Sequence, residues 1–110
     1  MSDYNLTGLK EMAQGNDDFV KNMINVFLEH TPPILEEMNE SFKKGDLKKV
    51  GELAHQIKPS VDLMGIESVH EIIRDVEKKG KDNIIEGMNS NINKLNVVMS
   101  SVFATMGSEL

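Results

Sequence analysis

The sequence predicts an all-α fold, an antiparallel four-helix up-down bundle with a short extra helix at the N-terminus. Apolar residues recur at alternating spacings of three and four, the period of one helix face. Aromatic residues make up only 5% of the chain while there are 8 Met, which suits an aliphatic helical core better than a sheet. A chain of 110 residues has room for one such core. We therefore expect a single domain over residues 1–110.

A regular stripe of apolar residues predicts a helix over residues 46–64. Asp46 can cap its N-terminus with the carboxylate, and Gly65 stands where helices often end in the left-handed conformation. Pro59 lacks a backbone N–H, so we expect a kink beside it. An end at Lys58 is the disfavoured alternative, because the stripe keeps its phase beyond the proline. The stripe consists of Leu47, Val50, Ala54, Ile57, Val61 and Met64.

Two more helices are predicted downstream. Ser68 and Glu71 have the spacing of a capping box, and the short apolar face that follows predicts a helix over about 68–79. The last stripe predicts one long helix that begins at 82 or 83 and ends at 105. Its apolar residues are Ile85, Met88, Ile92, Leu95, Met99, Val102 and Met106.

Upstream, Asn16 can cap a helical segment that reaches to about residue 42. Pro32 and Pro33 interrupt its hydrogen-bond ladder, and the sequence leaves open whether this is one kinked helix or two. A short apolar pattern around Leu9 predicts the extra leading helix, packed across one end. Short connections between the four main segments require neighbouring helices to run in opposite directions.

Composition excludes several classes of function. Eighteen acidic and 12 basic residues give a net charge of −6, which argues against a nucleic-acid partner. There is no Cys, so disulfides and thiolate sites are excluded. No apolar run approaches the ~20 residues of a membrane span, and the first residues do not resemble a secretory signal. We therefore expect a cytoplasmic protein with no membrane partner.

The candidate site lies on the outer side of the helix predicted over residues 46–64. His55 falls just off its apolar stripe, with Gly51 and Pro59 one turn away on either side. Lys58 can reach an anion at the imidazole, and Asp62 completes the exposed ridge. A neutral imidazole offers a nitrogen lone pair for attack on phosphorus, and phosphoryl transfer needs mainly positioning and charge neutralisation. The pattern indicates a phosphoryl acceptor that a second protein can approach.

The run from Ala54 to Gly65, AHQIKPSVDLMG, resembles the signature of histidine-containing phosphotransfer (HPt) domains, roughly A-H-x-L/I-K-G-S/A-x-x-x-x-G. The likeness covers about residues 4–105 and implies a four-helix bundle. In the family, the histidine takes a phosphoryl group from a receiver-domain aspartate and passes it on. By matching positions, His55 would be the phosphorylated residue and Lys58 the phosphoryl-contacting cation. Pro59 replaces the usual Gly, so any contact to that backbone N–H is lost.

The resemblance implies a carrier in a multistep two-component phosphorelay. Its partners would be response-regulator receiver domains and a hybrid sensor histidine kinase, and the protein would be a monomer. No ATP-binding signature is present, so an ATP-dependent kinase is not expected. No cofactor is expected either, magnesium being expected on the partner receiver domain. The alternative is a non-catalytic helical docking module that uses the same face, Gly51, Pro59 and Asp62 included.

The remaining polar candidates favour structural roles. His30 and His70 have no partner at a spacing typical of metal ligands, so no metal site is expected. The basic cluster at 78–81 suits the C-terminal end of a helix dipole, although one of its Lys side chains could face the phosphoryl site. Six methionines on the apolar stripes are interpreted as core residues, namely Met23, Met38, Met64, Met88, Met99 and Met106.

Overall fold

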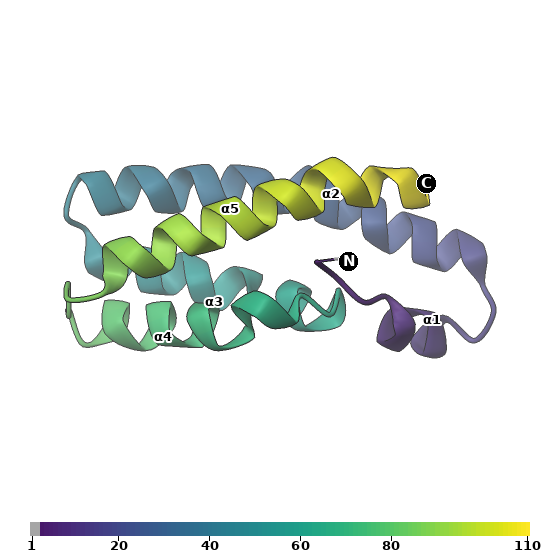
Figure 1. The fold of residues 1–110 in the computed structure, drawn as a ribbon, viewed down its shortest axis with the longest axis horizontal. Helices are drawn as coiled ribbons and strands as arrows, with labels where there is room; N and C mark the ends of the chain where they lie inside the picture. Colours follow the sequence, from purple (N-terminus) through teal and green to yellow (C-terminus); the bar gives the residue numbers. More distant parts are fainter. Residues whose placement is uncertain (1–2) are drawn as a thin grey trace.

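The computed structural model describes residues 3–110, and all of its regular structure is helical. The prediction of an all-α chain is confirmed. Two helices, α2 and α5, run along the length of the molecule, α3 and α4 lie side by side, and α1 covers one end (Figure 1). The elements are α1 (Thr7–Ala13), α2 (Asp17–Lys43), α3 (Leu47–Leu63), the 3₁₀ turn η1 (Glu67–Val69), α4 (His70–Lys81), α5 (Met88–Met106) and the 3₁₀ turn η2 (Gly107–Glu109).

Helix α2 is one continuous helix, which answers the question that the sequence left open. The Asn16 side chain accepts a hydrogen bond from the Phe19 N–H at 3.0 Å, as the capping pattern predicts. Pro32 and Pro33 both lie inside the helix. The axis of α2 changes direction near its middle (Figure 1), as expected where two consecutive residues cannot donate to the preceding turn.

Helix α3 follows the predicted pattern closely. The Asp46 carboxylate accepts from the Lys49 N–H at 3.1 Å. The helix continues through Pro59 to Leu63, so the alternative of an end at Lys58 is wrong. Gly65 follows with a φ of +62°, the left-handed conformation expected at the end of a helix.

The boundaries of the next two helices differ from the predictions. The segment predicted over 68–79 is η1 followed by α4, which ends at Lys81, and neither start has a side-chain cap. The capping box of Ser68 and Glu71 is therefore wrong. The long C-terminal helix begins at Met88 rather than at 82 or 83. Residues Asn83 and Gly87 have φ values of +57° and +79°, which a right-handed helix cannot contain, and residues 82–87 form a turn instead.

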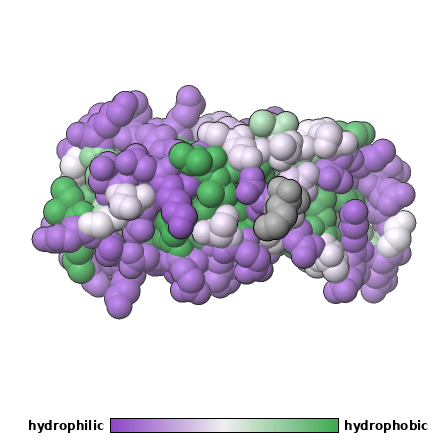
Figure 2. Space-filling view, viewed as in Figure 1, coloured by the Kyte–Doolittle hydropathy of each residue, from purple (hydrophilic) through white to green (hydrophobic). Residues whose placement is uncertain are grey.

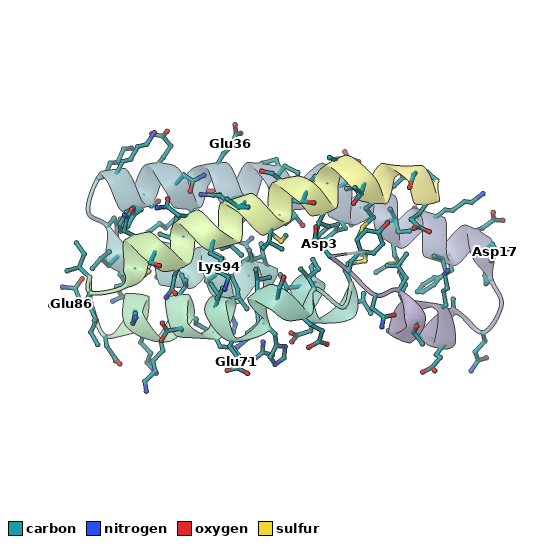
Figure 3. All side chains as sticks on the ribbon, in the orientation of Figure 1. Asp3, Asp17, Glu36, Glu71, Glu86 and Lys94 are labelled. Atoms are coloured by element: carbon teal, nitrogen blue, oxygen red, sulfur yellow. The ribbon has the colours of Figure 1, made fainter. Side chains whose placement is uncertain are left out.

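The core is aliphatic and draws on every helix. The methionines predicted for the core are buried, except that Met23 is only partly buried. Charged side chains such as Glu36, Glu71 and Glu86 point outward (Figure 3). On the face seen in Figure 2, weakly polar and hydrophobic residues gather along the C-terminal half of α5, whereas the Asn-rich N-terminal half, which also carries Lys94, is more hydrophilic.

Candidate functional site

The site rests on a close crossing of two helices at a pair of glycines. Helix α3 packs more extensively against α4 than against any other element. A Cβ on Gly80 of α4 would lie 2.5 Å from the Cα of Gly51 in α3, a distance that excludes any larger residue without movement of the backbone. The crossing brings the α3 residues that follow Gly51 within reach of long side chains on α4.

His55 of α3 and Glu77 of α4 meet beside this crossing. The His55 side chain is 70% exposed, and its Nδ1 lies 2.6 Å from Glu77 Oε2. Lys58 donates from Nζ to the other carboxylate oxygen, Oε1, at 2.7 Å. Its side chain is only 28% exposed. One carboxylate therefore bridges the histidine and the lysine that the sequence singled out.

This bridge fixes the protonation pattern of the imidazole. The ammonium of Lys58 lowers the pKa of Glu77 most strongly, the hydrogen bond from His55 lowers it further, and partial burial opposes both. An ionised carboxylate can only accept hydrogen bonds, so Nδ1 of His55 carries the proton. In the neutral ring, Nε2 then holds the lone pair. The arrangement leaves the nucleophilic nitrogen on the exposed side of the imidazole.

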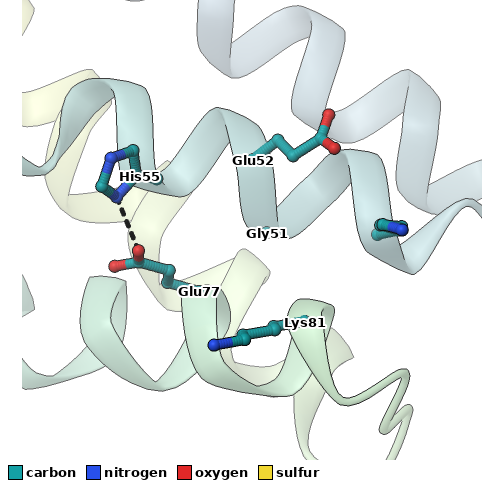
Figure 4. A pocket seen from close by; sticks show the side chains of 6 residues that line it. Gly51, Glu52, His55, Glu77 and Lys81 are labelled. Atoms are coloured by element: carbon teal, nitrogen blue, oxygen red, sulfur yellow. Dashed lines mark hydrogen bonds and ion pairs between the residues drawn. The ribbon is translucent and has the colours of Figure 1, made fainter.

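A hollow of about 330 Å³ opens between α3 and α4 next to the imidazole (Figure 4). Its floor is the glycine crossing, and Lys48 and Lys81 stand beside it. Lys81 comes from the basic cluster at 78–81, so one Lys of that cluster does face the region of His55, as the sequence left open. The lining residues are Lys48, Gly51, Glu52, His55, Glu77 and Lys81.

Two of the predicted docking residues have different surroundings from those expected. Gly51 is buried against α4, not an exposed small neighbour of the imidazole, because the helices cross there. Asp62 does not stand free on the ridge. Its carboxylate accepts from Arg74 at 2.7 Å, an interaction that lowers its pKa, and it lies 3.2 Å from Nδ1 of His70. Pro59 is exposed, as expected.

A second depression of about 200 Å³ lies between α2 and α3, beyond the side of α3 that carries Gln56 and Ser60. Its walls are mostly apolar, and Val26 is 44% exposed there. His30 lines the same depression. This surface continues from the exposed side of α3 and is called the α2–α3 groove below.

Glu77 is the functional candidate that sequence reasoning missed. It is 22 residues from His55 and 19 from Lys58, so no spacing within one helix connects them. The position of Glu77 on α4, one turn before Lys81, could have identified it only if the register between α3 and α4 had been known. Within residues 3–110 there is no group of three His, Asp or Glu side chains that could hold a metal ion. None of the helices there is long and apolar enough to cross a bilayer.

Comparison with known proteins gives one finding. The family model described as Hpt domain matches residues 22–101. The matched stretch contains α3, α4 and every residue of the site described above. The searches of curated proteins and of solved structures found no match.

Proposed function

We propose that this chain, which belongs to the Hpt domain family, accepts a phosphoryl group on His55 from a receiver-domain aspartate and passes it to another receiver domain. Hpt domains are phosphotransfer modules of two-component signalling, and the proposal adds the residue and the place in a multistep relay. The observation that carries it is the shared carboxylate of Glu77, which holds both His55 and Lys58.

The transfer step uses the free nitrogen of the imidazole. The Nε2 lone pair of His55 attacks the phosphorus of an aspartyl phosphate, and a P–N bond forms as the P–O bond to the aspartate breaks. The carboxylate of the partner leaves with the electron pair. The imidazole becomes a phosphorylated imidazolium, whose Nδ1–H remains hydrogen-bonded to Glu77. The anionic carboxylate stabilises this positive charge, and the reverse sequence passes the phosphoryl group on.

In this scheme Lys58 neutralises charge on the phosphoryl group. Before transfer its ammonium is paired with Glu77. Once the imidazole becomes cationic, the same carboxylate faces two positive groups, so its pairing with the lysine weakens. The ammonium is then available to the phosphoryl oxygens beside it. Charge neutralisation of this kind is the main contribution that protein side chains make to phosphoryl transfer.

The partner would dock on the framework of an antiparallel four-helix bundle, with the α2–α3 groove as the contact region. Val26 and Ile34 provide an apolar centre, while His30 and Gln56 provide a polar edge, and Gln56 follows His55 directly on α3. Receiver domains and a hybrid sensor kinase of a cytoplasmic phosphorelay are the partners we propose. Magnesium would be held by the receiver domain rather than by this chain.

Transfer from a receiver domain prephosphorylated with a small-molecule phosphodonor tests the proposal. We expect label on the wild type that is labile in acid and stable in alkali, and none on His55→Gln. The His70→Gln variant, which changes a histidine outside the bridge, is the matched control and should keep the label. Label on His55→Gln equal to that of the wild type would refute the assignment. Calorimetric binding of receivers without any label would favour the docking-module alternative.

A further inference from the structure

Lys58, the lysine of the H-x-x-K motif, is not the only cation near His55. Lys58 is already paired with Glu77, whereas Lys48 and Lys81 stand beside the hollow with no ion-pair partner among residues 3–110. Lys81 extends along α4 toward Glu77 (Figure 4). Two unpaired ammonium groups thus flank an open space next to the proposed phosphoryl acceptor.

The hollow combines these charges with an accessible volume. Its floor is formed by the backbone of Gly51 and leaves room for an inserted side chain. The carboxylate of Glu77 is offset by its bonds to Lys58 and His55, which leaves Glu52 as the one other carboxylate among the lining residues, against the two ammonium groups of Lys48 and Lys81. The balance of charge in the hollow is therefore positive, in a chain whose net charge is −6.

We propose that this hollow binds a carboxylate side chain of the phosphodonor protein, held between Lys48 and Lys81, and thereby selects partners with an acidic residue beside their phosphorylated aspartate. The inference rests on the proposed function of His55. Lys48 lies seven residues before His55 on α3, about 10 Å along the helix. A protein surface centred on His55 reaches that far.

Electrostatic reasoning favours an acidic partner residue over a neutral one. The rest of the surface repels acidic proteins, so a local positive hollow both attracts such a partner and orients it. Contacts of this type at the edge of an interface act mainly on association and are screened by salt. They leave the chemical step at His55 unchanged.

The test is the initial rate of phosphoryl transfer as a function of the concentration of a prephosphorylated receiver domain that labels the wild type. For the Lys48→Gln/Lys81→Gln double variant we expect the half-saturating receiver concentration to rise about 10-fold at low salt, with the maximal rate unchanged. At about 0.5 M NaCl the half-saturating concentrations of the wild type and the double variant should become equal. Glu52→Gln should change the half-saturating concentration in the opposite direction, since it removes the remaining acidic group from the hollow.

Lys78→Gln is the matched control, because Lys78 is an exposed residue of the same helix, does not line the hollow and removes the same charge. An unchanged half-saturating concentration in the double variant, or an equal rise in Lys78→Gln, would overturn the proposal. A wild type that takes no label from phosphorylated receivers would instead refute the function of His55. In that case calorimetric binding of the unphosphorylated receivers to the wild type and the double variant still tests the hollow.

Discussion

Alanine at position 80 tests how tightly the fold holds the site together. A Cβ on residue 80 would stand 2.5 Å from the Cα of Gly51, and 2.6 Å from the carbonyl oxygen of Leu47. Both are backbone atoms, which cannot swing aside as a flexible side chain can. Gly80→Ala therefore forces α3 and α4 apart beside His55 and Glu77.

The size of the effect follows from the distances. Ordinary contact begins at 3.4 Å, so the helices must separate by about 1 Å. Overpacking of a well-packed interior costs roughly 1–3 kcal/mol, and rigid neighbours favour the upper end of that range. Alanine is a better helix former than glycine by about 1 kcal/mol, which offsets part of the cost. We expect a net loss of roughly 2 kcal/mol, or about 8 °C in Tm.

Urea unfolding followed by circular dichroism measures this loss. Gly8→Ala is the matched control, since Gly8 lies in α1 with nothing within 4 Å of an added Cβ, and it should be at least as stable as the wild type. Gly51→Ala should fall between them, because its Cβ would meet the Glu77 carbonyl oxygen at 3.0 Å. A Gly80→Ala variant as stable as the wild type would refute the reasoning about the helix crossing.

Three more predictions concern single residues. Pro59→Ala restores a hydrogen-bond donor inside α3 and should raise the free energy of unfolding by about 1–3 kcal/mol; a loss in urea unfolding would contradict this. Gly65→Ala should destabilise by more than Gly45→Ala, because both glycines have positive φ but only a Cβ at 65 would meet the carbonyl of Asn5; equal losses in thermal unfolding would argue against that contact. The pKa of Glu77 is lowered in the folded state, so its stabilising contribution is present above the unfolded pKa and disappears as the pH falls through the folded pKa. Glu77→Gln should therefore lose less stability than the wild type below about pH 4, and identical pH profiles of unfolding would count against the ion pair.

The local part of the structure could be predicted from the sequence, because caps and stripes depend on residues within one or two turns. Asn16 and Asp46 cap their helices as the pattern indicates, and Gly65 takes the left-handed conformation. The start of α5 could not be found in the same way. Ile85 fits the three-four spacing but is 59% exposed in a turn, because the positive φ of Gly87 ends any continuous helix there.

The contacts between helices were beyond sequence reasoning. Gly80 reads as a helix stop, since glycine is common after the last turn, yet it lies inside α4 as the contact point with α3. Nothing in the sequence singles out Glu77 from the other acidic residues of α4. Its role emerges only when the register of α4 against α3 is known, and a single sequence contains no signal for that register.

The glycine crossing explains how a common set of side chains becomes a site. The side chain of Glu77 reaches only a short distance from α4. Its carboxylate can therefore contact both His55 and Lys58 only where the axes of α3 and α4 come close. Residues 51 and 80, with no side chains, permit that approach. With larger residues there, the imidazole would be a solvated surface histidine whose two ring nitrogens are equally free to hold the proton. Helix packing therefore determines which nitrogen is nucleophilic, and the reactivity we propose for His55 depends on Gly51 and Gly80 as much as on the H-x-x-K spacing.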